Sequence, residues 1–514
     1  MRDQEFQVSE SALKKKGFLA WIERVGNKMP HPFVMFLEII TIVLGCSFVF
    51  GMMGASAVHP TSKETITVVN LISIKGLLFF MDNFVKNFQT FPVLGIVLVL
   101  GVATGLCDRT GFFSTAIKMG LANKKGNTVV FIIAIIGIVA HNAGDVSFIL
   151  VPAIAGAMFY GMHRHPLAGV FLGYASVGGG FTTTLIPSGM DAILAPVTIQ
   201  AANTILPGFY MPLLCGYFFL FVSGLLCAIA ATYITIKVIE PMLGKYEAGE
   251  GTSATDMNVL PEEAKAVKKA GLAVLAFIIL LVLLCIPSNS FLRNPETGSL
   301  IFRAPFMTDM QFFIIVIFAL AGVVYGVSVG KIRSFIDAIK LMEDATKTLA
   351  PFIVLAIVIG QFLALFDQSK LGHVLAIRGG QFLASLPVPM AVIVLLFLLL
   401  TTVINLFIGS GSTKWLLMGP IFVPMLMQLN LNPAFIQSVY RLGDSATNHL
   451  TPLFAYFAIL LTTAQGYDKK TGMGTLFSAM LPYSAAFLCV YAVQTFVWMM
   501  FDLPTGFGGG IWLN

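Results

Sequence analysis

The sequence predicts an all-α polytopic membrane protein with about nine transmembrane helices and two re-entrant hairpins, arranged as inverted-topology repeats. Of its 514 residues, 57% are hydrophobic and only 11% are charged, whereas soluble proteins carry about 25% charged residues. Apolar runs of about twenty residues recur along the whole chain, and each is long enough to cross a bilayer. Polar, helix-breaking segments interrupt some runs, and irregular backbone is tolerated at membrane depth only inside protein or beside a watery cavity.

The first half of the chain begins with residues 1–29, a basic segment whose Lys and Arg residues predict a cytoplasmic N-terminus. A first transmembrane repeat is predicted over 30–240, because apolar runs there alternate with polar or basic segments. Its expected elements are, in order, a span at about 32–53, an interfacial helix at about 77–91, a span at about 93–107, a hairpin at about 128–162, a Gly-broken span after Pro166 and a span at about 210–239.

The second half follows a polar linker, 241–270, which is rich in Glu and Lys and is predicted to be cytoplasmic. A second repeat is predicted over 271–503, and residues 504–514 form an extracytoplasmic tail. The expected elements are spans at about 272–285, 312–325 and 351–365, a hairpin at about 388–428, a broken span after Pro433 and a last span at about 476–500.

Residue spacing supports a repeat. Three pairs match in the two halves: Pro152 with Pro420 and Asn142 with Ser410 at 268 residues, and Pro166 with Pro433 at 267 residues. In both halves a hairpin is followed by a broken, Thr/Ser-rich span and then by a long plain one. One hairpin is expected to enter from the cytoplasm and the other from outside, so the repeats are inverted. Inverted repeats with discontinuous helices are typical of secondary transporters.

The two hairpin tips, 142–145 and 409–412, are the candidate ion and substrate sites. Short helical arms leave backbone N–H and C=O groups without intrahelical partners, so their N-termini attract anions and freed carbonyls can bind a cation. Oxygen donors that suit Na⁺ come from Asn405, Ser410, Ser412 and Asp444. Gly409 lets the backbone approach an ion closely.

The carboxylates Asp145, Asp191 and Asp444 are the residues at membrane depth that are expected to bind a cation or carry a proton. Arg441 precedes Asp444 by three residues, so the two share a helical face, and a structural ion pair is an alternative reading. Asp145 could equally cap the second hairpin arm.

Two further residues at the second tip have open roles. Trp415 either stacks on an aromatic substrate or packs the hairpin against its surroundings. Lys414 either snorkels or binds a carboxylate.

Several function classes are excluded or disfavoured. The six cysteines are scattered through apolar segments without metal-site spacing. The chain has no GxxxxGK[ST] loop, which disfavours transport driven by ATP. Its charge of +6 lies in loops and gives no indication of nucleic-acid binding. An enzyme would need a fuller constellation than His141 with Asp145. No cofactor is expected beyond a bound Na⁺.

The motifs of the chain are similar to those of the AbgT family of p-aminobenzoyl-glutamate transporters. The resemblance extends from about Trp21 to Gly509. It is carried by the opening motif from Trp21 to Pro32, by His141 with Asp145, by Gly180-Phe181-Thr182 followed by Asp191, and by Ser410-Gly411-Ser412 with Trp415, Pro424, Pro433, Arg441, Asp444 and Pro452.

This resemblance implies a homodimer in a bacterial inner membrane. By the same resemblance, the substrate path is lined by Asp191, Ser412, Trp415, Pro433, Arg441, Asp444 and Pro452, and the coupling cation lies near Asn405, Gly409 and Asp444, with Asn142, Asp145 and Asp191 as further candidates. Family members take up p-aminobenzoyl-glutamate or export sulfonamide-like antimetabolites, coupled to Na⁺ or H⁺.

The leading hypothesis is therefore a secondary active transporter of p-aminobenzoyl-glutamate-like aromatic acids. A sulfonamide-exporting antiporter on the same scaffold is the first alternative. A general dicarboxylate or amino-acid carrier is the second, and Trp415 argues against it. The expected partners are a small aromatic acid, a coupling cation, lipid and a second copy of the chain.

Overall fold

The computed structural model describes residues 32–58, 63–91, 94–121, 126–142, 147–183, 185–244, 246, 259–301, 303–451 and 456–513. The basic segment 1–29 and part of the predicted linker lie outside these ranges. Two predicted site residues, Asp145 and Pro452, also lie outside them.

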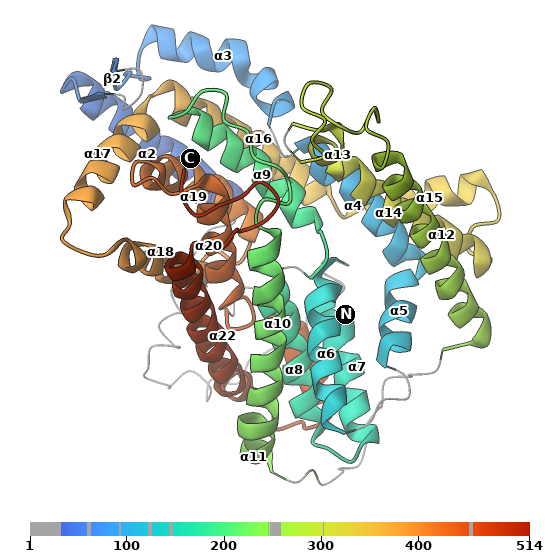
Figure 1. The fold of residues 1–514 in the computed structure, drawn as a ribbon. Helices are drawn as coiled ribbons and strands as arrows, with labels where there is room; N and C mark the ends of the chain where they lie inside the picture. The colour runs from blue at the N-terminus through green and yellow to red at the C-terminus, as the bar shows by residue number, and fades with distance from the viewer. Residues whose placement is uncertain are drawn as a thin grey trace, which may run out of the picture.

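The first half of the chain forms helices and one short sheet (Figure 1). The elements are α2 Pro32–Met52, β1 Ser56–Val58, β2 Thr65–Thr67, α3 Ile74–Gln89, α4 Leu94–Thr110, α5 Phe112–Leu121, α6 Asn127–Ala140, α7 Ser147–Gly161, α8 Pro166–Gly180, α9 Gly189–Asn203, α10 Tyr217–Ile234, a π-helical turn Thr235–Ile239 and α11 Glu240–Leu243. The two strands pair antiparallel, with Ser56 opposite Thr67.

The described part of the second half is helical. Its elements are α12 Pro261–Cys285, α13 Pro305–Thr308, α14 Met310–Ser328, α15 Phe335–Lys347, α16 Ala350–Gln368, α17 Leu371–Ser385, α18 Met390–Asn405, α19 Gly411–Met427, α20 Pro433–Ser445, α21 Phe457–Gln465 and α22 Met473–Phe501.

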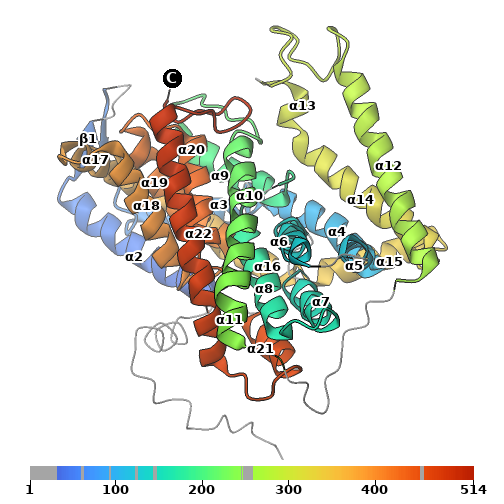
Figure 2. The same ribbon diagram turned by 60° about the horizontal axis from the view of Figure 1, so that its bottom comes forward.

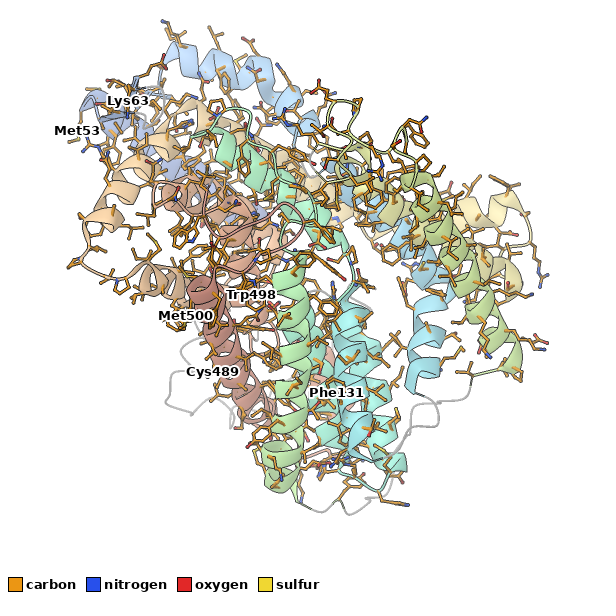
Figure 3. All side chains as sticks on the ribbon, viewed as in Figure 1. Met53, Lys63, Phe131, Cys489, Trp498 and Met500 are labelled. Atoms are coloured by element: carbon orange, nitrogen blue, oxygen red, sulfur yellow. The ribbon has the colours of Figure 1, made fainter. Side chains whose placement is uncertain are left out.

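The helices confirm the predicted class, an all-α polytopic membrane protein. Within the described ranges, seven helical segments are long and apolar enough to cross a membrane. Helices α8–α9 and α20–α21 lie at the positions of the two predicted broken spans. Exposed side chains such as Cys489 and Met500 lie along α22 (Figure 3), as expected for a helix that faces lipid.

Pairs of short apolar helices lie where the two hairpins are predicted, and their re-entrant course in a membrane stays a prediction. Helices α6 and α7 match the hairpin predicted over 128–162, and α18 and α19 match the one predicted over 388–428. Pro152 and Pro420 lie inside the second arms, and Pro166 and Pro433 begin the helices that follow. The order of elements is therefore the same in both halves. Their inverted orientation across a membrane stays a prediction.

Some helices lie where the sequence analysis expected none. Helix α15 was missed because it is amphipathic rather than apolar, and its cap comes from Ser334, whose side chain accepts a hydrogen bond from the Asp337 N–H. Helix α12 begins at Pro261, inside the predicted linker, because Pro at the first position and two acidic residues in the first turn favour a helix start there. Helices α5 and α17 were also missed.

The buried centre of the molecule is formed by closely packed helices. All fifteen residues of α8 are buried, and α8 packs against α6 and α7. Glycines allow the close approach to α7, because a Cβ at Gly169 would lie 2.3 Å from the Ala155 carbonyl oxygen. Helices α10 and α22 lie side by side, while α12 and α14 pair on another side of the molecule (Figure 2).

Candidate transport site

Helix α20 is the element around which the site is built. Asn432 caps it by accepting a hydrogen bond from the Ala434 N–H, and Pro433 occupies its first turn, where a missing N–H costs nothing. Every residue of α20 is buried, although the helix carries Arg441 and Asp444. Buried charges need partners. These are supplied by the ends of α8, α9, α18 and α19.

Asp444 forms an ion pair with Lys414 at the start of α19. The Lys414 Nζ donates to Asp444 Oδ1 at 2.6 Å, and both side chains are fully buried. The same Nζ donates to Asn405 Oδ1 at the end of α18 and lies 5.6 Å from the ring centroid of Tyr440. Lys414 therefore binds a carboxylate in this structure and does not snorkel.

The second oxygen of Asp444 is held by two uncharged donors. Its Oδ2 accepts from Thr182 Oγ1 at 3.1 Å and from Asn448 Nδ2 at 3.2 Å. Thr182 follows α8, so this bond links the broken spans of the two halves. The Thr182 hydroxyl also lies 2.6 Å from the Ser445 hydroxyl, and the Thr182 N–H donates to Ser445 Oγ at 3.1 Å.

Arg441 forms the second buried ion pair, with Asp191 at the start of α9. Its Nη1 donates to Asp191 Oδ1, and its Nε donates to the Thr182 carbonyl oxygen at 2.6 Å. Asp191 also caps α9, because its Oδ2 accepts from the Ser188 N–H at 2.8 Å. The ion pair considered between Arg441 and Asp444 does not form among the described residues. Each of the two residues pairs with another helix instead.

Trp415 lies one residue after Lys414 and is fully buried. Its ring packs on Tyr440, with ring centroids 4.3 Å apart. Its Nε1 donates to Thr198 Oγ1 on α9 at 2.9 Å, and Thr198 Oγ1 donates in turn to Gln437 on α20. In this arrangement the indole joins hairpin 2 to the first half of the chain.

The remaining predicted residues lie around this centre at different depths. Gly409 and Ser412 are half-buried at the tip of hairpin 2. Asn142 lies at the tip of hairpin 1, where its Nδ2 donates to the Val139 carbonyl oxygen at 3.1 Å. Pro433 begins α20, eleven residues before Asp444 and therefore about 16 Å from it along the helix axis.

Sequence analysis did not single out several residues that complete the site. Tyr440, Asn448, Ser445 and Thr198 contact the predicted residues directly. The sequence carried a signal for two of them on α20, because Tyr440 directly precedes Arg441 and Ser445 directly follows Asp444. No local signal marks Thr198, which contacts Trp415 only through the tertiary fold. Thr182 was noted in a motif, but its contact with Asp444 spans 262 residues.

Comparison with known proteins agrees with this architecture. A family model of AbgT transporters matches residues 17–513. The p-aminobenzoyl-glutamate transport protein of Escherichia coli K12 is 32% identical over 489 residues, which cover 95% of this chain and 96% of that protein.

Two solved structures are also similar. The YdaH transporter of Alcanivorax borkumensis, described as having an unusual topology, has a TM-score of 0.86 and 35% identity over 93% of this chain and 100% of that one. MtrF of Neisseria gonorrhoeae, described among antimetabolite efflux pumps, has a TM-score of 0.88 and 33% identity over 94% of this chain and 97% of that one. Family, relative and fold agree, and the chain belongs to the AbgT family, as a multi-pass membrane transporter and not an enzyme.

Proposed function

We propose that this transporter is a secondary active carrier of p-aminobenzoyl-glutamate-like aromatic acids, coupled to a gradient of Na⁺ or H⁺. The substrate class is supported by the E. coli relative, which is a p-aminobenzoyl-glutamate transport protein. Coupling to an ion gradient is supported by ionisable groups in the core of a membrane protein, which are costly to bury and mark ion or substrate pathways.

The observation that carries the proposal is an unsatisfied donor on Arg441. Among the described residues, its Nη2 is buried and has no hydrogen-bond partner, while Nη1 and Nε are both used. A buried guanidinium with a spare N–H favours a carboxylate ligand, because Arg binds carboxylates through charge-assisted hydrogen bonds. The glutamate part of the substrate offers such a group.

The spacing of the site also suits this substrate. Arg441 contacts Asp191, and Trp415 contacts Thr198, seven residues further along α9. These two contacts are therefore about 10 Å apart along the helix. A ligand with an aromatic ring at one end and carboxylates at the other could meet the indole and the guanidinium together.

Substrate access requires hairpin 2 to move. Trp415 is fully buried and hydrogen-bonded to α9, so the indole can meet a ligand only when α19 separates from α9 or α20. Such a step, alternating between closed and open arrangements, is the movement that a secondary transporter needs.

Export of an antimetabolite is the second candidate, favoured by the similarity to MtrF, which is described among antimetabolite efflux pumps. The same site chemistry could serve it, because sulfonamides share the aromatic amine of p-aminobenzoyl-glutamate.

The test is uptake of radiolabelled p-aminobenzoyl-glutamate into proteoliposomes under an imposed Na⁺ gradient or pH gradient. We expect accumulation under at least one gradient. No accumulation under either, combined with sulfonamide efflux from loaded liposomes, would reject import and support the second candidate.

The proposal also includes the setting of the protein. We place it as a homodimer in the bacterial inner membrane, with its N-terminus cytoplasmic and its C-terminus extracytoplasmic. Its partners are the aromatic acid, the coupling cation and lipid, and it needs no cofactor or nucleic acid. Cross-linking in membranes and labelling of cysteines introduced at either end would test these assignments.

A further inference from the structure

The ammonium group of Lys414 lies where a coupling cation would be expected. Its Nζ contacts Asp444 Oδ1 at 2.6 Å and Asn405 Oδ1. A carboxylate oxygen and an amide oxygen are ligands that a hard cation such as Na⁺ would take. Lys414 is fully buried, and its Nζ also lies 5.6 Å from the Tyr440 ring centroid. A cation is thus already attached to the chain at this position.

The hydrogen bonds of Asn405 fix its amide oxygen toward Lys414. Its Nδ2 donates to the Asp444 carbonyl oxygen at 2.7 Å, to Asn448 Oδ1 at 2.8 Å and to Thr447 Oγ1 at 3.1 Å. Because all three partners are acceptors, only the NH₂ group of the amide can face them. The oxygen is therefore held on the cation side.

The rest of the Asp444 carboxylate is occupied. Oδ2 accepts from Thr182 and Asn448, and a Cβ added at Gly411 would lie 3.0 Å from Oδ2 and 3.1 Å from Oδ1. The start of α19 is therefore packed directly against the carboxylate. A Na⁺ ion could take the Oδ1 position only by displacing an ammonium group of the same charge.

We propose that Lys414 is the built-in cation of this site, and that it makes the transporter proton-coupled and prevents Na⁺ from binding to Asn405 and Asp444. The inference rests on the proposed function and names its coupling ion. The exchangeable proton belongs to the Lys414–Asp444 pair. When an N–H bond of Lys414 breaks and an O–H bond forms on Asp444, both groups become neutral, and loss of that proton to water leaves one negative charge.

The surrounding charges do not replace Lys414 as partner of Asp444. From α20, Tyr440 faces Lys414 with its ring, and Arg441 is paired with Asp191 of α9. His141 of hairpin 1 contacts the Ile138 carbonyl oxygen through its Nδ1. Among the described residues, the segment after α8 and the end of α18 contribute the uncharged Thr182 and Asn405. Loss of the proton therefore leaves Asp444 without an ionic partner, which favours its return before the site moves through the membrane.

The first test measures ²²Na⁺ binding to the purified full-length protein, without substrate. We expect no saturable binding to wild type and saturable binding to Lys414→Met, which removes the charge but keeps an apolar chain of similar length. The double variant Lys414→Met/Asp444→Asn is the matched control, and it should bind no Na⁺ because the carboxylate is gone. Saturable, Asp444-dependent binding to wild type would overturn the proposal.

Thermal stability gives a second readout. In Lys414→Met, Asp444 is an uncompensated buried charge, so Na⁺ should raise the apparent melting temperature as a bound ligand does. Wild type and the double variant should show no such rise. If Lys414→Met folds only in the presence of Na⁺, that result also supports the proposal. A folded Lys414→Met that neither binds nor is stabilised by Na⁺ would contradict it.

Transport assays separate this inference from the proposed function. In wild-type proteoliposomes, a pH gradient should drive uptake, and replacing Na⁺ with choline should change the rate less than about twofold. Na⁺-driven uptake by wild type would overturn the role of Lys414 and leave the function intact. Absence of uptake under any gradient would reject the function, while the ²²Na⁺ experiment would still decide the role of Lys414.

Discussion

At the scale of single residues, Thr182 joins the two buried ion pairs. Its hydroxyl donates toward Asp444 Oδ2, and its carbonyl oxygen accepts from Arg441 Nε. Backbone and side chain of one residue thus contact both charged centres. Because Thr182 and the two charged residues belong to different halves of the chain, the position of α8 and the electrostatics of α20 are linked at this point.

Replacing Thr182 with Val should impair transport without unfolding the protein. The change keeps the shape of the side chain but removes the hydroxyl that contacts Asp444 Oδ2 and the Arg441 carbonyl oxygen, and losing a partner of a buried polar group costs about 1–3 kcal/mol. We expect the initial uptake rate to fall by about tenfold or more. Thr182→Ser keeps the hydroxyl and is the control. Equal uptake by both variants would show that the hydroxyl is not part of the mechanism.

Arg441→Lys tests whether geometry matters in addition to charge. Lysine keeps the positive charge but cannot contact Asp191, the Thr182 carbonyl oxygen and a substrate carboxylate in one fixed plane. Uptake should fall by at least about tenfold, with the larger effect on KM if Arg441 binds substrate carboxylate. Arg109→Lys, at an exposed position, is the matched control. A wild-type KM in Arg441→Lys would contradict this role.

The sequence predicted which charged residues lie in the buried centre better than how they pair. Asp191, Arg441 and Asp444 were all singled out, because charges inside apolar segments are visible in one sequence. The pairing was not visible. The spacing of Arg441 and Asp444 pointed to an intrahelical pair, yet Arg441 reaches Asp191, which is 250 residues away. Such partners are set by the tertiary fold, and no local pattern records them.

At the scale of helices, glycine determines how closely the second arm of hairpin 1 meets the span that follows. Gly169 of α8 faces the Ala155 carbonyl of α7, and Gly173 faces Pro152, where a Cβ would lie 2.9 Å from Cα. These contacts leave no space for a side chain, so hairpin 1 and α8 form one tightly packed unit. The hairpin boundaries themselves were predictable from apolar runs that end at polar tips. Amphipathic α15 was not, because its sequence lacks such a run.

Gly169→Ala should destabilise this unit. The added methyl group would meet the α7 backbone at 2.3 Å, and overpacking of this kind costs about 1–3 kcal/mol. We expect a lower apparent melting temperature of the purified protein. At Gly271 of α12, an added Cβ meets nothing within 4 Å, so Gly271→Ala should be neutral or slightly stabilising. If both variants melt alike, the α7–α8 contact is not as rigid as this packing implies.

At the scale of the whole molecule, the first and second halves meet through buried polar contacts. Asp191 with Arg441, Thr182 with Asp444, and Trp415 with Thr198 all connect one half to the other. Apolar packing alone would hold the halves in many similar arrangements, whereas paired charges satisfy their partners only in a few. A movement of the halves relative to each other would therefore have to break these polar contacts.

Of the contacts between the halves, the Asp191–Arg441 pair is the one whose loss should lower the thermal stability most. Asp191→Asn keeps a side-chain oxygen that can accept from the Ser188 N–H, but it leaves Arg441 charged and unpaired in the interior. Removing one partner of a buried pair costs about 3–5 kcal/mol, so the apparent melting temperature should fall clearly. Ser188→Ala removes the hydroxyl that donates to Asp191 Oδ2 but leaves the ion pair in place, and it should cost about 1 kcal/mol.

The double variant Asp191→Asn/Arg441→Met then separates stability from function. With no unpaired charge left, it should recover most of the lost thermal stability, because apolar replacement of a buried ion pair is often neutral. It should remain inactive in uptake, because the guanidinium that we assign to the substrate is gone. A double variant as unstable as Asp191→Asn alone would show that the loss of stability does not come from an unpaired Arg441, and that the ion pair itself stabilises the contact between the halves.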